Sequence, residues 1–308
     1  MKRTVPGDLD GERADRVVAV LTGTSRARAR RLVEDGNATF GGQTVAPSVR
    51  VASGAVVRVW IPDPPPGLVP ERVPFEVRYE DEHLAIVDKP AGITVHPGAG
   101  QQTGTLAAGL LRRWPKIDGV GEESRWGIVH RLDTGTSGLL VVALTPEAHA
   151  LLTEAMASRK IRRSYLALAH GSFEVPRGTV DAPVGRDPTK PVRFRVGPAG
   201  RPARTHYRRL AAWQSPQVTL LELELETGRT HQIRVHLASI GHPVVGDAVY
   251  GNKGAEPPGP RVWLHATRLS FKHPIAGDEL TVESPLPDDL AESLAALGMP
   301  AVGRVPEM

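Results

Sequence analysis

The chain has 308 residues, 40% of them hydrophobic and 23% charged, which is enough for one large and one small globular domain. It has no cysteine, which excludes disulfides, thiolate zinc sites and iron–sulfur clusters, and we expect a cytoplasmic protein. The net charge is +4; residues 1–61 hold ten Lys/Arg against six Asp/Glu, and the rest of the chain holds 28 of each sign. This N-terminal charge favours contact with a polyanion such as RNA, although a solvated basic face is the alternative.

Residues 25–34 are predicted to form the first clear helix. Thr24 or Ser25 is a suitable N-cap, and Gly36 is a suitable terminator. Short strands are expected near residues 39–40, 44–45 and 56–61. A basic helix beside a small sheet can place cationic side chains along a phosphate backbone. We therefore predict RNA contacts by the arginines of this helix: Arg26, Arg28, Arg30 and Arg31.

The run Pro-Asp-Pro-Pro-Pro-Gly-Leu-Val-Pro at residues 62–70 favours extended polyproline geometry and cannot continue a helix or a central strand. We therefore predict a small α/β domain at residues 1–61, a linker at 62–70 and a larger domain at 71–308. The longest apolar run, residues 139–144, is too short to cross a bilayer. No membrane partner is expected.

The larger domain mixes strands and helices. Four apolar or alternating stretches are predicted to be strands: residues 84–87, 139–144, 165–169 and 221–226. Thr145 begins a helix that runs to about Arg159, because Thr caps a helix and the Pro and Glu that follow suit its first turn. A second helix, with Ile233 on its apolar face, ends at Gly241. Many strands with few helices predict an α+β fold with a mixed, mostly antiparallel sheet.

A polar, glycine-rich stretch lies between apolar segments and reads Gly127-Ile-Val-His-Arg-Leu-Asp-Thr-Gly-Thr-Ser-Gly138. Such loops hold reactive groups on a rigid scaffold. Asp133 lies within it, two residues after Arg131, and a carboxylate beside a cation stays ionised and can act as a nucleophile or base. An isolated Arg-Leu-Asp is more typical of a residue that caps a turn. The residues alone leave both interpretations open.

With residues 139–143, this stretch resembles the catalytic motif of the RluA-type pseudouridine synthases. Three further stretches resemble motifs of that family in the same order: residues 89–97, Arg163-Ser-Tyr165, and 227–236 with its continuation to 251. Arg163 stands where the family usually has Lys. Residues 13–16 and 25–36 are similar to the S4 RNA-binding module. The resemblance covers nearly the whole chain and is to the large-subunit rRNA, RluD-like members of the family.

The resemblance implies a pseudouridine synthase catalytic domain preceded by an S4-like RNA-binding domain, in a monomer that modifies 23S rRNA. In this isomerisation the N1–C1′ bond of uridine breaks, the uracil turns, and its C5 bonds to C1′. Nothing is oxidised and no group leaves, so no cofactor, nucleotide or metal is expected. Asp133 is implied as the catalytic carboxylate. It attacks C1′ or C6, or removes a ribose proton, and the sequence leaves the route open.

Other residues are expected to act around Asp133. Arg229 is expected to pair with it, which keeps the carboxylate charged and fixes its rotamer. Tyr165 is expected to stack on the uracil and to assist proton removal from C5. Because the base must be flipped out, Arg131 is expected to fill the vacated stack. His130 is expected to shape the loop and to contact RNA.

Ile233 and Leu264 are expected to form the apolar wall of the pocket, although a plain core position explains Ile233 equally well. The same residues leave two other functions as alternatives. A non-catalytic RNA-binding protein has no need of a complete catalytic set. A hydrolase of glycosidic bonds usually needs a second carboxylic acid. Asp247 lies in the third motif, but the sequence assigns it no such role.

Overall fold

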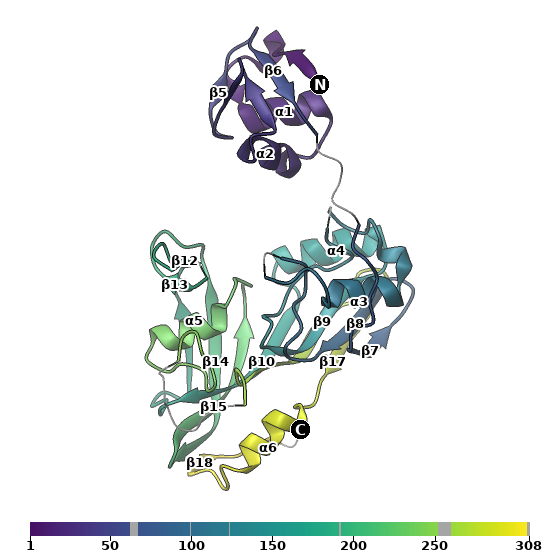
Figure 1. Cartoon of the computed structure of the whole chain (residues 1–308). Helices are drawn as coiled ribbons and strands as arrows, with labels where there is room; N and C mark the ends of the chain where they lie inside the picture. Colours follow the sequence, from purple (N-terminus) through teal and green to yellow (C-terminus); the bar gives the residue numbers. More distant parts are fainter. Residues whose placement is uncertain (62–66, 99, 123, 191, 252–259, 307–308) are drawn as a thin grey trace. The chain divides into compact units, whose positions relative to one another are not determined.

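The computed structural model describes residues 1–61, 67–98, 100–122, 124–190, 192–251 and 260–306. The chain divides into two compact units, Met1–Gly67 and Leu68–Met308 (Figure 1). The first five residues of the predicted linker, 62–66, lie outside the described residues. Within the described residues, every helix is too short or too polar for a membrane span.

The N-terminal unit packs two helices against short strands. Its elements are β1 (Lys2–Thr4), a 3-10 turn (Gly7–Leu9), β2 (Glu12–Arg13), α1 (Ala14–Thr22), α2 (Arg26–Glu34), β3 (Ala38–Phe40), β4 (Gln43–Thr44), β5 (Arg50–Val51) and β6 (Val56–Val59). One sheet has the order β1-β6-β3-β4, and β2 pairs with β5. Helix α2 is the predicted basic helix, and its predicted cap is confirmed because Arg28 N donates to Ser25 Oγ at 3.3 Å. Helix α1, not predicted from the sequence, buries Val17 and Val18 in this core.

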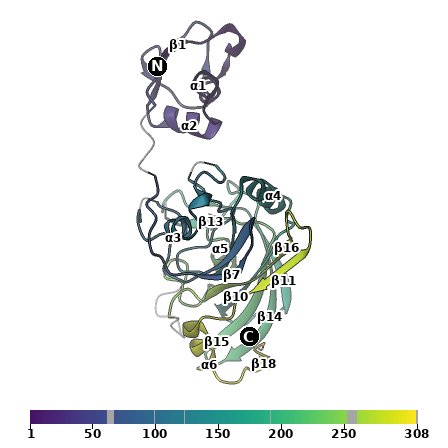
Figure 2. The ribbon, with the colours of Figure 1, turned by 90° about the vertical axis from the view of Figure 1, so that its right-hand side faces the viewer.

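The second unit is built on one ten-stranded sheet that runs through the whole unit (Figures 1 and 2). Its main path has the order β11-β14-β15-β10-β16-β9-β8-β7, with β17 paired to β16 and β18 paired to β14. The pairing of β16 with β9 is parallel, and the other pairs are antiparallel. The prediction of a mixed, mostly antiparallel sheet is therefore confirmed. The strands are β7 (Glu76–Glu80), β8 (Leu84–Lys89), β9 (Ser137–Ala143), β10 (Arg162–His170), β11 (Arg177–Asp181), β14 (Arg204–Gln214), β15 (Gln217–Leu225), β16 (Leu264–Lys272), β17 (Glu279–Glu283) and β18 (Val302–Gly303).

Helices pack on this sheet, and a small hairpin of β12 (Val184–Arg186) and β13 (Phe194–Val196) stands apart from it. The helices are α3 (Leu106–Arg113), α4 (Pro146–Ala157), α5 (Gln232–Ser239) and α6 (Asp288–Ala295), with a 3-10 turn at Pro115–Ile117. Helix α4 is the predicted helix, and Thr145 caps it as predicted by accepting from Ala148 N at 3.2 Å. Predicted strands coincide with β8, β9, β10 and β15 within a few residues.

The apolar residues of the second unit form two main clusters. One packs β8 and β9 against α3 and α4, and the other packs β10, β14 and β15 against α5 and α6. Strand β16 contributes to both, with Phe271 in the first cluster and Leu264 in the second. All seven residues of β9 are buried, which is the pattern of a strand covered on both faces. The centre of the sheet is therefore rigid on both sides of β16.

Helix α6 and β18 lie at the end of the unit away from α3 and α4, as both views show (Figures 1 and 2). Two indole groups fasten this end of the chain. Trp213 Nε1 donates to the carbonyl oxygen of Gly298 at 3.0 Å, and Trp263 Nε1 donates to Ser293 Oγ at 2.8 Å. Each buried tryptophan thereby satisfies its one donor.

Candidate active site

Asp133 sits in the loop that leads into β9. Thr136 N donates to the carbonyl oxygen of Asp133 at 3.0 Å, which closes a turn. Where the loop ends, β9 runs so close to β16 that a Cβ on Gly138 would lie 2.2 Å from the carbonyl oxygen of Ala266. Gly138 also has a φ of +114°, which residues with side chains rarely adopt. Glycine at this position therefore lets the loop carrying Asp133 join the centre of the sheet.

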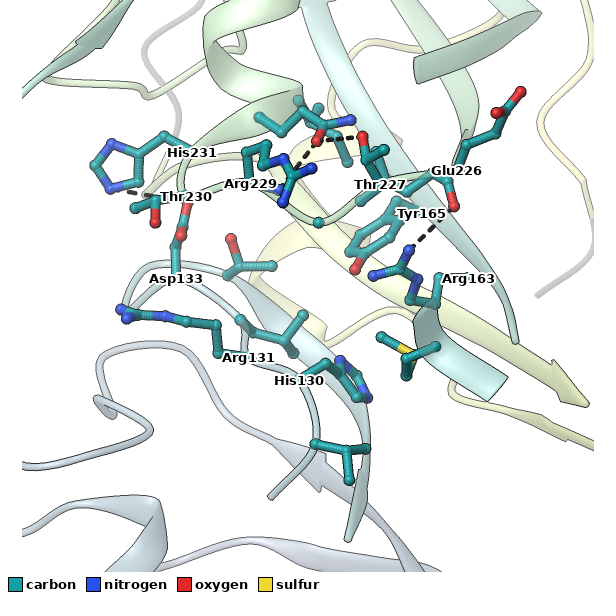
Figure 3. A pocket seen from close by; sticks show the side chains of 18 of the residues that line it. His130, Arg131, Asp133, Arg163, Tyr165, Glu226, Thr227, Arg229, Thr230 and His231 are labelled. Carbon is teal, nitrogen blue, oxygen red and sulfur yellow. Dashed lines mark hydrogen bonds and ion pairs between the residues drawn. The ribbon is translucent and has the colours of Figure 1, made fainter. Parts of the chain in front are cut away.

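The carboxylate of Asp133 is 15% exposed and lines a cavity of about 430 Å³ (Figure 3). Arg234 NH1 donates to its Oδ2 at 3.1 Å. His231 Nε2 lies 4.0 Å from the same oxygen. Burial lowers the pKa of His231, although the charge of Asp133 opposes this, so the ring is neutral at pH 7. Arg234 is thus the cation that neutralises Asp133.

Arg234 is itself held by a second carboxylate. Its Nε donates to Asp247 Oδ2 at 2.7 Å and its NH2 to Asp247 Oδ1 at 2.9 Å, the two-pronged geometry that suits a guanidinium. Burial opposes the charge on Arg234, but the hydrogen bonds and charges of Asp247 and Asp133 outweigh it and raise the pKa of the guanidinium. Oδ1 of Asp247 also accepts from Val249 N and Tyr250 N, at 2.9 and 3.1 Å. One buried cation therefore joins two acids in a fixed orientation.

The expected pairing of Arg229 with Asp133 is wrong. Arg229 lines the same cavity, but its Nε donates to the carbonyl oxygen of Pro202 at 3.1 Å. Between the two arginines of this motif, His231 adopts a left-handed φ of 57°, and α5 begins at the next residue. This leaves Arg229 before the helix and puts Arg234 in its first turn. A buried arginine is stabilised by carboxylate partners, so Asp247 of the same motif was the signal that could have identified Arg234.

Tyr165 reaches the cavity from β10 and is 5% exposed. Burial raises the pKa of its phenol; the charge of Arg163 opposes this and that of Asp133 adds to it, so the hydroxyl is protonated at pH 7. Ile233 and Leu264 line the cavity and are 4% and 3% exposed. Both also belong to an apolar core cluster. The wall of the pocket and the core of the unit are therefore the same surface at these two positions.

Arg131 and His130 differ in what they offer to RNA. Arg131 is exposed and lines the cavity. His130 Nε2 accepts a hydrogen bond from Val141 N at 3.1 Å, which ties the loop to β9. Burial and then the charge of Arg163 lower the pKa of His130 to about 3, so the ring is neutral. RNA contact by these two residues stays a prediction, and for His130 it does not include a positive charge.

The arginines of α2 belong to the N-terminal unit. Arg26 and Arg30 are 63% and 60% exposed, and each lies near an acid of its own unit: Arg26 NH2 is 3.8 Å from Asp15 and Arg30 Nε is 2.8 Å from Glu34. The pair of Arg30 and Glu34 is exposed and contributes little to stability. Asp15 is buried and lies closer to Arg13, at 2.8 Å, than to Arg26. Arg31 is exposed and Arg28 is half-buried. Their contact with RNA stays a prediction.

Lys89 lies fully buried behind the loop of Asp133, a role that the sequence did not predict. Its Nζ donates to the carbonyl oxygens of Pro90 at 2.8 Å, Ile93 at 2.9 Å and Thr134 at 3.4 Å. Burial lowers the pKa of Lys89 to about 7, and the charge of Asp133 opposes this. The amine therefore fastens the residue next to Asp133 to the end of β8.

A model of the RNA pseudouridylate synthase family matches residues 83–239. The chain is 44% identical over 304 residues to ribosomal large subunit pseudouridine synthase D of Nitrosomonas europaea, which covers 96% of this chain and 87% of that protein. It is 46% identical to an uncharacterized RNA pseudouridine synthase of Chloroflexus aurantiacus, over 93% of this chain and 90% of that protein. The structure of human RNA pseudouridylate synthase domain containing 1 aligns with a TM-score of 0.56 and 26% identity, over 77% of this chain and 98% of that one.

The family match spans the loop of Asp133, the strand of Tyr165 and the helix of Arg234. It begins after residue 82, so it does not name the N-terminal unit, and the S4 resemblance of that unit stays a prediction. The full-length relatives extend across both units, because their alignments cover more than nine-tenths of this chain. The chain belongs to the RNA pseudouridylate synthase family and is a pseudouridine synthase, an isomerase.

Proposed function

We propose that this enzyme converts specific uridines of 23S rRNA to pseudouridine, with Asp133 as the catalytic carboxylate. The observation that carries the proposal is the buried arrangement of Asp133, Arg234 and Asp247 beside a cavity that Tyr165 also lines. The large-subunit rRNA as substrate is supported by the name of the Nitrosomonas europaea relative, which aligns over nearly the whole chain.

The geometry suits a single reacting carboxylate. Arg234 holds Asp133 in one orientation and balances its charge, so the carboxylate needs no reorganisation before it attacks or removes a proton. Asp247 is fully buried and turned toward Arg234. Because Asp247 has no access to a substrate, Asp133 and Asp247 do not form the two-acid arrangement of a glycoside hydrolase.

Tyr165 and the apolar wall complete the pocket for a flipped base. The ring of Tyr165 offers a face for the uracil to stack on, and its hydroxyl assists the removal of the proton from C5. Ile233 and Leu264 supply the apolar surface opposite polar groups, which is the usual composition of a small-molecule pocket. The target nucleotide enters this pocket after it has left its stack.

The N-terminal unit supplies affinity and placement in this proposal. Residues 1–61 carry an excess of four positive charges, and the rest of the chain is neutral overall. Phosphate contacts position a protein on nucleic acid without carrying the chemistry. Binding of α2 to the RNA backbone is therefore assigned to this unit, and isomerisation to the unit that begins at Leu68.

The test uses 23S rRNA transcribed with uridine tritiated at C5. Isomerisation releases the C5 tritium to water and leaves the uracil attached to the RNA. Free uracil would identify a hydrolase, and no release from any rRNA would identify a binding protein. Mapping of pseudouridines in cells with and without the gene then identifies the target. Unchanged 23S rRNA alongside altered tRNA would overturn the rRNA assignment.

A further inference from the structure

Arg163 is a buried cation in the same cavity, and the reaction as described above does not use it. The side chain comes from β10, two residues before Tyr165, so strand geometry places both on one face of the sheet. Arg163 is 5% exposed, whereas its neighbour Arg162 is exposed on the other face. Figure 3 shows the guanidinium of Arg163 beside Tyr165, on the side where Glu226 lies.

Within the described part of the chain, Arg163 has no carboxylate partner. Its NH2 donates to the carbonyl oxygen of Leu225 at 3.2 Å, and its Nε is buried without a hydrogen-bond partner. The acid nearby, Glu226, is instead bound by Arg159, Arg204 and His206. A buried charge that lacks an opposite charge destabilises the free protein. Such a group is retained where a ligand supplies the missing negative charge.

The groups around Arg163 are short of acceptors. The ring of His130 is neutral, and because its Nε2 accepts from Val141 N, its other nitrogen, Nδ1, carries the proton. That Nδ1 is also buried without a partner. Gly228 leaves room for the guanidinium, since a Cβ there would lie 2.8 Å from Arg163 NH1. Two N–H donors just behind this wall of the cavity therefore lack acceptors, beside an arginine that lines the cavity.

We propose that Arg163 is a further catalytic residue: its guanidinium contacts a carbonyl oxygen of the uracil and stabilises the negative charge that the ring acquires during isomerisation. The inference rests on the proposed function. When the N1–C1′ bond breaks, its electron pair stays on N1 and spreads to the carbonyl oxygens. If a nucleophile instead adds to C6, the charge also reaches a carbonyl oxygen. Bonding of C5 to C1′, loss of the C5 proton and protonation of N1 then restore a neutral ring, and on the second route the nucleophile also leaves C6.

The first experiment measures single-turnover tritium release from C5-tritiated 23S rRNA by the full chain at saturating enzyme. Arg163→Met removes the charge at similar length, and we expect the rate to fall by roughly 10²–10³-fold, the effect of losing one preorganised donor. The dissociation constant for the RNA should stay within about twofold, because a contact that matters when charge develops contributes little to binding. Arg163→Lys keeps the charge without the planar fork of the guanidinium, and its rate should lie between those of the wild type and Arg163→Met. Arg162→Met is the matched control and should react as wild type does.

The second experiment repeats the comparison with RNA that contains 5-fluorouridine. Fluorine withdraws electrons and stabilises the uracil anion, so less help is needed from the protein. Because fluorine cannot leave C5 as a cation, it stays on the base, and the reaction on this RNA is followed only to bonding of C5 to C1′. That step is measured as loss of the N-glycosidic 5-fluorouridine, by chromatography and mass spectrometry after digestion. The rate deficit of Arg163→Met should be smaller on this RNA. A structural role for Arg163 predicts the same deficit on both substrates.

Three results would overturn the inference. They are a wild-type rate for Arg163→Met, equal deficits on the two RNAs, and a loss of affinity with normal turnover at saturation, which would indicate a phosphate contact instead. If the wild-type enzyme released no tritium at all, the proposed function would fail, and the inference would fail with it. A wild-type enzyme that is active beside an equally active Arg163→Met variant rejects the inference alone.

Discussion

Asp247→Asn tests whether the buried acid behind Arg234 is needed to hold the active site. The substitution keeps the shape of the side chain but replaces one oxygen with an NH2 group. Asp247 now receives two hydrogen bonds from Arg234, at 2.7 and 2.9 Å, and its side chain is fully buried. With Asn at position 247, one N–H of the Arg234 guanidinium would face the new NH2 group, which is also a donor. Arg234 would keep Asp133 as its remaining carboxylate partner.

The expected loss of stability follows from these contacts. Removing one partner of a buried ion pair costs about 3–5 kcal/mol. Because Asn retains one acceptor and Arg234 keeps a second acid, we expect the lower limit, about 3 kcal/mol. For a unit of this size, that lowers Tm by roughly 6–12 °C. A guanidinium that is displaced by about 1 Å should also reduce kcat by roughly 10²-fold.

Thermal unfolding followed by tryptophan fluorescence measures the loss of stability. The fluorescence reports mainly on the second unit, because four of the five tryptophans lie there (Trp114, Trp126, Trp213 and Trp263) and only Trp60 lies in the first. Tritium release at a temperature well below Tm measures the reduction in kcat. Glu283→Gln is the matched control, because its pair with Arg268 is exposed and worth less than about 1 kcal/mol. An Asp247→Asn protein that melts and reacts as wild type does would refute the reasoning.

Four further outcomes are expected. Asp133→Asn should fold and bind RNA but give no isomerisation, and a tenth of wild-type turnover would contradict its role. Arg229→Lys should lower the rate less than Arg234→Lys does, since Arg229 contacts Pro202 rather than Asp133; tritium release ranks the two. The pKa of Lys89 is about 7 in the folded protein and about 10.4 in the unfolded chain, so between these pH values the unfolded chain binds more protons. The free energy of unfolding therefore rises with pH in this range, by up to about 1.4 kcal/mol per pH unit. Urea unfolding of the Lys89→Met variant at pH 7 and 8.5 should lack this rise. Deleting residues 1–61 should leave activity on short RNA intact. It should reduce the slope of the logarithm of the rRNA binding constant against the logarithm of salt concentration, by roughly 0.7–0.9 for each of about two to four lost phosphate contacts. Identical slopes for the full chain and the shortened chain would show that α2 does not touch RNA.

Local signals in the sequence predicted much of the fold. Ser25 and Thr145 cap their helices as predicted, because a cap needs only residues three positions apart. The alternation before Glu226 correctly predicted the second half of β15, where Glu222 is half-buried, Glu224 is exposed and the leucines that alternate with them are buried. Helix α1 was not predicted, because its N-cap is Arg13, which makes no side-chain capping hydrogen bond and gives the sequence no start signal for a helix.

The candidate site was less predictable because its contacts are distant along the chain. Asp133 and Arg234 are 101 positions apart, so only Asp247, the acid 13 positions beyond Arg234, could have favoured Arg234 over Arg229. The burial of Lys89 was equally hidden, since a lysine is expected at the surface unless its partners are known. Its partners are backbone carbonyl groups, and these leave no trace in a sequence.

The position of β16 has a consequence for synthesis on the ribosome. This strand follows β9, β10 and β15 along the chain, yet it lies between β10 and β9 and pairs with both. Until residues 264–272 have emerged, β7–β9 and β10–β15 are two separate half-sheets with exposed edges, which is the state in which nascent chains associate wrongly. Asp133 precedes β9 and Tyr165 lies on β10, so the two residues come together only when the strand between them is inserted. A chain interrupted before Leu264 would contain the reactive carboxylate and the tyrosine but no assembled active centre, and the enzyme therefore becomes competent only after β16 has been synthesised.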